Sequence, residues 1–104
     1  MVHLKQNNKQ TNISFHGDEI VSTVNLLKNI IGQPQHIQND GTGKVNYMWD
    51  CFTHDNIPFT IYDWKLYKPI GDFDLIKFHI GAENLKDSNH AKSCLAKIFE
   101  RYVR

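Results

Sequence analysis

A short segment of the chain combines aromatic rings with positive charges. The segment is Tyr62-Asp63-Trp64-Lys65-Leu66-Tyr67-Lys68, and Lys77 and His79 follow it after a short interval. Aromatic faces stack on flat bases with little preference for sequence, and a lysine ammonium group neutralises phosphate. The sequence therefore predicts a ligand-binding surface with six members: Tyr62, Trp64, Lys65, Lys68, Lys77 and His79.

Strand alternation predicts that these residues share one surface. If the apolar residues Phe59 and Ile61 face the core, then Tyr62 projects from the opposite side of the sheet. Lys77 and His79 alternate with apolar neighbours in the same way. The structural alternative is that the rings only stabilise an open sheet face through cross-strand pairs, while the lysines keep that face hydrated.

The sequence lacks the common catalytic motifs. It contains no G-x-S-x-G, G-x-x-x-x-G-K, G-x-G-x-x-G or H-E-x-x-H pattern. No two of its six histidines are four residues apart on a predicted helix. We therefore predict no catalytic residue, no metal site, no cofactor and no enzymatic activity.

Both cysteines fall within the apolar stripes of predicted elements. Cys51 and Cys94 lie far apart in the sequence and lack the C-x-x-C halves of a zinc knuckle. Free cysteine is among the most buried residue types. We predict that both are reduced core thiols with no chemical role.

Size and charge limit the class of protein. The chain has 104 residues, 40% of them hydrophobic, and a formal net charge of +1, which suits one globular domain without disulfides or metals. Such a small net charge argues against strong nucleic-acid binding, which depends on a large positive field. The chain has no apolar run of transmembrane length and no signal-type stretch, so we expect a cytoplasmic protein without a membrane partner.

The chain divides into a leader and one domain. The first eleven residues are polar and rich in Asn and Gln, a composition that gains little from burial. The apolar periodicity lies in the rest of the chain. The prediction is a flexible leader of residues 1–11 followed by a single domain of residues 12–104.

The first half of this domain predicts a strand, a helix and a loop. Residues 12–15 alternate in polarity as a strand does. Gly17 interrupts this strand, and Asp18 can cap a helix over residues 19–31. The polar segment 33–44 is rich in turn-forming residues and predicts a loop.

The second half predicts three strands and a helix. Residues 45–52 and 58–62 alternate in polarity on either side of a turn, which predicts an antiparallel hairpin. Residues 76–80 predict a further strand. Asp87 or Ser88 can cap the final amphipathic helix, whose apolar stripe has the clearest periodicity in the chain.

Together these elements predict an α+β fold. The expected order is β-α-β-β-β-α, with a small antiparallel sheet of three to four strands and both amphipathic helices packed on one face. The apolar faces should meet in a single core. Its predicted members are Leu27, Ile31, Trp49, Ile61, Phe78, Leu95 and Phe99.

The run Phe59-Thr60-Ile61-Tyr62-Asp63-Trp64-Lys65, with His79-Ile80-Gly81 and the closing helix, resembles a pattern in small uncharacterised proteins encoded by bacteriophages. The resemblance covers about the last two-thirds of the chain, which departs from the pattern at Phe78, where the pattern has tryptophan. Many such phage proteins block host defence in the infected cell, either by binding a defence protein or by sequestering a nucleotide signal. The resemblance implies a binding protein in the host cytoplasm.

Two functions remain open at this point. In the first, the protein sequesters a nucleotide-like small molecule on its aromatic and basic surface, and a second copy of the chain can complete the pocket as a homo-oligomer. In the second, the same surface binds a host protein, because aromatic anchors with a cationic rim also mark protein interfaces.

Overall fold

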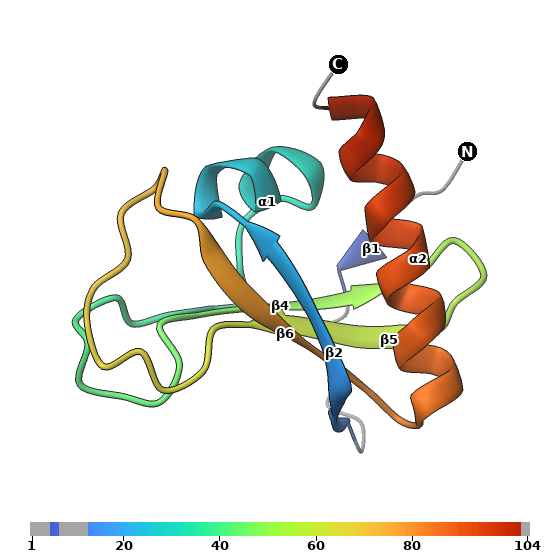
Figure 1. The fold of residues 1–104 in the computed structure, drawn as a ribbon, viewed down its shortest axis with the longest axis horizontal. Helices are drawn as coiled ribbons and strands as arrows, with labels where there is room; N and C mark the ends of the chain where they lie inside the picture. The colour runs from blue at the N-terminus through green and yellow to red at the C-terminus, as the bar shows by residue number, and fades with distance from the viewer. Residues whose placement is uncertain (1–4, 7–12, 103–104) are drawn as a thin grey trace.

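A computed structural model describes residues 5–6 and 13–102. It confirms the α+β class, and Figure 1 shows how the elements are arranged. In chain order they are β1 (Lys5–Gln6), β2 (Ser14–Ser22), α1 (Val24–Ile30), β3 (His36–Ile37), β4 (Tyr47–Phe52), β5 (Pro58–Tyr62), β6 (Ile76–Ala82) and α2 (Leu85–Tyr102).

The strands of the described residues form one antiparallel sheet in the order β1-β4-β5-β6-β2. β3 shares an edge of β4 with β1, since β1 pairs with the Cys51–Phe52 end and β3 with the Tyr47–Met48 end. The predicted hairpin of β4 and β5 is confirmed. The predicted size of three to four strands is too small, because β1 and β3 have only two residues each and show no periodicity.

Both helices contribute to one core on one side of the sheet. Alternate residues of β4, β5 and β6 point toward it because successive side chains of a strand face opposite ways. The buried cluster includes Trp49, Phe59, Ile61, Phe78 and Ile80 from the sheet, Val24 and Leu27 from α1, and Ala91 and Leu95 from α2. Two predicted core residues, Ile31 and Phe99, are only partly buried and pack against this cluster.

The predicted helix over residues 19–31 starts too early. β2 continues to Ser22, because Gly17, at φ +104°, lies in a bulge that shifts the register with β6 and lets the strand resume at Glu19. α1 begins only at Val24, where the Thr23 hydroxyl accepts a hydrogen bond from the Leu26 N–H at 3.1 Å. Ile20 at the end of β2 packs against the same core as α1, whereas Val21 is exposed on the other side of the sheet, so the combined apolar spacing resembled one helix.

The predicted caps of both helices are also corrected. α2 begins at Leu85, because the Asn84 side chain accepts a hydrogen bond from the Asp87 N–H at 2.8 Å. Ser88 is fully buried, and its hydroxyl donates to the Asp18 carboxylate at 2.7 Å. Asp18 therefore ties the bulge of β2 to α2 and does not cap α1.

The predicted leader, residues 1–11, lies outside the described residues except for Lys5–Gln6, which form β1. In the part of the chain that the structure describes, no helix has both the length and the apolar character needed to cross a membrane.

Replacing Leu95 by alanine should lower the free energy of unfolding by roughly 2–5 kcal/mol, because the side chain is fully buried and its removal leaves a cavity. Urea denaturation followed by circular dichroism measures this loss. Leu85→Ala is the matched control on the same helix, since Leu85 is 55% exposed and its truncation should change the free energy by about 0.5 kcal/mol or less. Equal effects of the two changes would contradict the core assignment.

Candidate ligand-binding site

Four rings gather on the side of the sheet opposite the core. We call this cluster, Phe15, Tyr62, Trp64 and His79, the aromatic face. His79 of β6 is central, since its ring stacks on Phe15 at 4.0 Å between centroids and lies 6.3 Å from the Trp64 ring, 29° from parallel. Tyr62 meets both neighbours edge to face, at 6.1 Å from Trp64 and 5.5 Å from His79. Because β2 and β5 flank β6, Phe15 and Trp64 approach His79 from opposite sides.

The outer members of the aromatic face are the accessible ones. Trp64 is 40% exposed and Phe15 is 42% exposed. The His79 side chain is only 16% exposed, and Tyr62 is half-buried. Burial raises the pKa of the Tyr62 phenol, so this ring stays neutral at physiological pH. A ligand would therefore stack on Trp64 or Phe15, with the two inner rings as support.

The charges around the aromatic face are unevenly distributed. The ammonium groups of Lys65 and Lys44 lie 5.5 Å and 6.0 Å from the centre of the Trp64 ring. In the described residues neither group forms an ion pair with a carboxylate. Glu19 lies at the other side, with Oε2 3.4 Å from Nε2 of His79. The Trp64 end of the face is therefore positive, and the region beside His79 carries a negative charge.

The structure brings four of the six predicted residues together: Tyr62, Trp64, Lys65 and His79. Lys77 lies on the same side of the sheet, exposed and opposite Val21 of β2. Lys68 is exposed in the loop after β5. Neither of these two lysines lies over a ring in the described part of the chain.

Three members of the site were missed by the sequence prediction. Phe15 and Glu19 fell in what were expected to be separate elements, a strand and a helix. Both belong to β2, where residues four apart lie on the same face, and the bulge at Gly17 sets the register that puts Glu19 opposite His79. Lys44 fell in a predicted loop. Its position depends on a hydrogen bond from the Lys65 N–H to the Lys44 carbonyl at 2.7 Å, which no local sequence pattern indicates.

The buried Asp63 carboxyl group connects the loop before β4 to the end of β5. It accepts hydrogen bonds at 2.8–3.1 Å from the N–H groups of Asn46 and Tyr47 and from the Asn46 side chain. The Asn46 amide also donates to the Lys68 carbonyl at 2.9 Å. Asp63 is 1% exposed, and these donors satisfy it as burial of such a group requires. Asp63 thereby positions Trp64, the next residue.

The backbone is also constrained in this region, where the long loop before β4 and the long loop after β5 lie together (Figure 1). Gly41, at φ +77°, packs so closely on the Lys68 backbone that a Cβ atom would come within 2.7 Å of its Cα. Lys65 and Tyr67 both adopt φ +53°, a left-handed conformation that costs a non-glycine residue roughly 1 kcal/mol or more. Such strain persists only where surrounding contacts impose it, and it is concentrated here beside Trp64.

Replacing Asp63 by alanine should lower the free energy of unfolding by at least about 3 kcal/mol, because it leaves three N–H donors without their buried partner. Urea denaturation provides the measurement. Asp72→Ala is the control, since the Asp72 side chain is exposed in a neighbouring loop and should contribute about 0.5 kcal/mol or less. A loss below about 1 kcal/mol for Asp63→Ala would show that the carboxyl group does not connect the loops.

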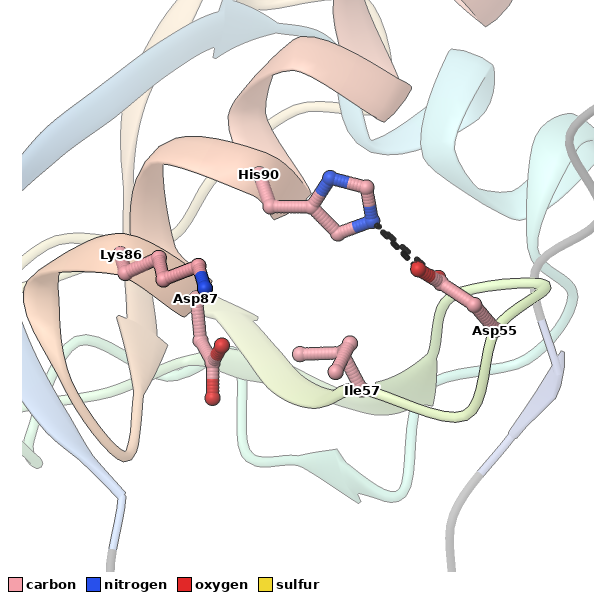
Figure 2. Close-up of a pocket in the computed structure, with 5 residues that line it drawn as sticks. All are labelled: Asp55, Ile57, Lys86, Asp87 and His90. Atoms are coloured by element: carbon pink, nitrogen blue, oxygen red, sulfur yellow. Dashed lines mark hydrogen bonds and ion pairs between the residues drawn. The ribbon is translucent and has the colours of Figure 1, made fainter.

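A second polar cluster joins the β4–β5 turn to α2. Nε2 of His90 lies 3.0 Å from Oδ2 of Asp55, and the Thr53 hydroxyl donates to the same carboxylate. The Sγ atom of Cys94 lies 3.7 Å from the same His90 nitrogen. A pocket of about 270 Å³ opens beside them and is lined by Asp55, Ile57, Lys86, Asp87 and His90 (Figure 2).

This cluster is not arranged as a catalytic triad. In a catalytic triad, one imidazole nitrogen contacts the carboxylate and the other contacts the nucleophile. Here the same nitrogen, Nε2 of His90, contacts both the Asp55 carboxylate and the Cys94 thiol. Burial and the Asp55 charge raise the pKa of the Cys94 thiol, so the reactive thiolate is disfavoured. Burial raises the pKa of Cys51 as well. Both cysteines are buried, as predicted.

The Asp55 contacts predict a pH-dependent stability. Hydrogen bonds from Thr53 and His90 lower the pKa of Asp55 from 3.8 to about 2. A carboxyl group whose pKa is lower in the folded state stabilises the fold above its unfolded pKa, and this contribution is lost as pH falls through the folded value. As the pH falls from 5 to 2, the difference in free energy of unfolding between the wild type and Asp55→Asn should therefore become smaller. Urea denaturation across this range measures it, and a constant difference would contradict the assignment.

No protein-family model, curated protein or solved structure matches this chain. Among the described residues, no three His, Cys, Asp or Glu side chains are placed to hold a metal ion together. The geometry of the aromatic face is therefore the basis for a functional proposal.

Proposed function

We propose that the protein is a non-catalytic binder of a nucleotide-like small molecule, held on the aromatic face. The observation that carries this proposal is the exposed Trp64 ring, with the ammonium groups of Lys65 and Lys44 within 6.0 Å of its centre. A flat base stacks on the ring, and the two lysines neutralise the phosphate group of the same nucleotide. Lys77 adds positive charge on the same side of the sheet, and Lys68 adds a further positive charge in the loop after β5.

The charges favour an anionic ligand over a cationic one. Aromatic clusters also bind quaternary ammonium groups through the faces of their rings. Here, however, two lysine ammonium groups already occupy the surroundings of Trp64 and would repel a cation. A ligand with a flat ring and a negative group uses both features of the site.

The resemblance to phage-encoded proteins suggests a biological role for such binding. A protein that holds a nucleotide signal without converting it lowers the free concentration of that signal. In an infected cell this would block a defence response, and the protein would act in the host cytoplasm, alone or as a homo-oligomer.

A second candidate function uses the same side of the sheet to bind a host protein. Val21, opposite Lys77 on the same side of the sheet, is 54% exposed, and Phe73 and Leu75 in the loop just before β6 are each 76% exposed. Exposed apolar groups next to aromatic residues also mark protein interfaces.

Tryptophan fluorescence tests the nucleotide proposal. Trp64 is accessible whereas Trp49 is fully buried, so a stacked base should quench Trp64 selectively. Titration with the 5′-monophosphates of adenosine, guanosine, cytidine and uridine should quench the emission, and the nucleotide should be recovered intact after denaturation. Trp64→Ala should weaken binding, measured by calorimetry, by roughly 1–3 kcal/mol. A stable complex with a host protein, together with no effect of any nucleotide, would favour the second function.

Lys65 supplies a variant that separates binding from folding. Lys65→Gly removes the ammonium group and also relieves the left-handed strain, so the variant should be at least as stable as the wild type yet bind more weakly. The weakening should be greater at low salt than at high salt. Lys92→Ala, an exposed lysine on α2, is the control and should leave binding unchanged. Unchanged binding in Lys65→Gly would contradict the role of Lys65.

A further inference from the structure

The aromatic face has a chemical polarity that limits which bases it accepts. Two ammonium groups lie over the Trp64 ring, and the Glu19 carboxylate lies beside His79, the next ring inward. Oε2 of Glu19 faces His79, while Oε1 has no hydrogen bond or ion pair within the described residues. The Glu19 side chain as a whole is 37% exposed.

A carboxylate only accepts hydrogen bonds, so it distinguishes among the bases. Exocyclic amino groups of cytosine and adenine donate hydrogen bonds, whereas the carbonyl oxygens in the corresponding positions of uracil and hypoxanthine are acceptors. An acceptor that meets a carboxylate loses its hydration without gaining a partner. Glu19 therefore favours a base with an amino group at the edge away from Trp64.

We propose that the site selects a nucleotide with an amino-bearing base, oriented with the amino group toward Glu19 and the phosphate toward Lys44 and Lys65. This inference rests on the proposed function and adds the class and orientation of the ligand. The two ammonium groups attract a phosphate group. In the reversed orientation, the Glu19 carboxylate would repel it. The bulge at Gly17 is what places Glu19 opposite His79.

Two matched pairs of ligands test this selectivity. Cytidine and uridine 5′-monophosphates differ at position 4 of the base, and adenosine and inosine 5′-monophosphates differ at position 6. Calorimetry should show about tenfold tighter binding of the amino-bearing member in each pair, the effect expected for one hydrogen bond to a charged group. Inorganic phosphate alone should compete only weakly, because it cannot stack.

Glu19→Gln provides the decisive variant. A glutamine amide can either accept from an amino group or donate to a carbonyl, so the selectivity should fall to less than about twofold while Trp64 fluorescence is still quenched. Asp50→Asn, on β4 of the same sheet, is the control and should keep the wild-type selectivity.

The outcomes separate the two proposals. Equal binding of both members of each pair to the wild-type protein would overturn the role of Glu19 and leave the proposed function standing. Selectivity that persists in Glu19→Gln would also overturn it. If none of these nucleotides binds, the proposed function and the inference both fail.

Discussion

The hydrogen bonds of the buried Asp63 carboxyl group hold together the corner on which the candidate site depends. Asn46 and Tyr47, at the start of β4, donate to a residue that directly follows β5. This contact closes the two long loops on each other, so that the Lys44 carbonyl meets the Lys65 N–H. Without that closure, the two ammonium groups would not share one ring. The buried Asp63 carboxyl group, with its hydrogen bonds satisfied, thus orders the loops around Trp64, which have few buried apolar side chains.

The sheet has two sides with different chemistry. One side packs against α1 and α2 and is apolar, which accounts for the fold and its expected stability. The other carries rings, lysines and a carboxylate, and its rings contact each other, stacked or edge to face, instead of a covering helix. His79 connects the two halves of this side, because it stacks on Phe15 and lies beside Trp64. The same cross-strand pairs that stabilise the sheet therefore also prepare a surface for stacking.

The His90 cluster shows why residue types alone do not define a catalytic site. Asp55, His90 and Cys94 are the types found in a cysteine hydrolase, and His90 and Cys94 are four residues apart on α2. Their geometry instead directs one nitrogen at two partners, and burial together with the Asp55 charge raises the pKa of the Cys94 thiol. The interaction joins the turn after β4 to α2. We interpret it as a structural contact between two elements that are distant in the sequence.

The sequence by itself determined the α+β class, the β4–β5 hairpin, most of the core and the common surface of Tyr62, Trp64 and His79. These features follow from local periodicity, since side chains alternate along a strand and recur every three to four residues along a helix. Only the tertiary structure decided that β2 runs through the Gly17 bulge, because the pairing partner of Glu19 lies on β6, about sixty residues away. It also brought Lys44 and Phe15 to the site. Those positions depend on hydrogen bonds and ring contacts between distant segments, which leave no periodic signal in the chain.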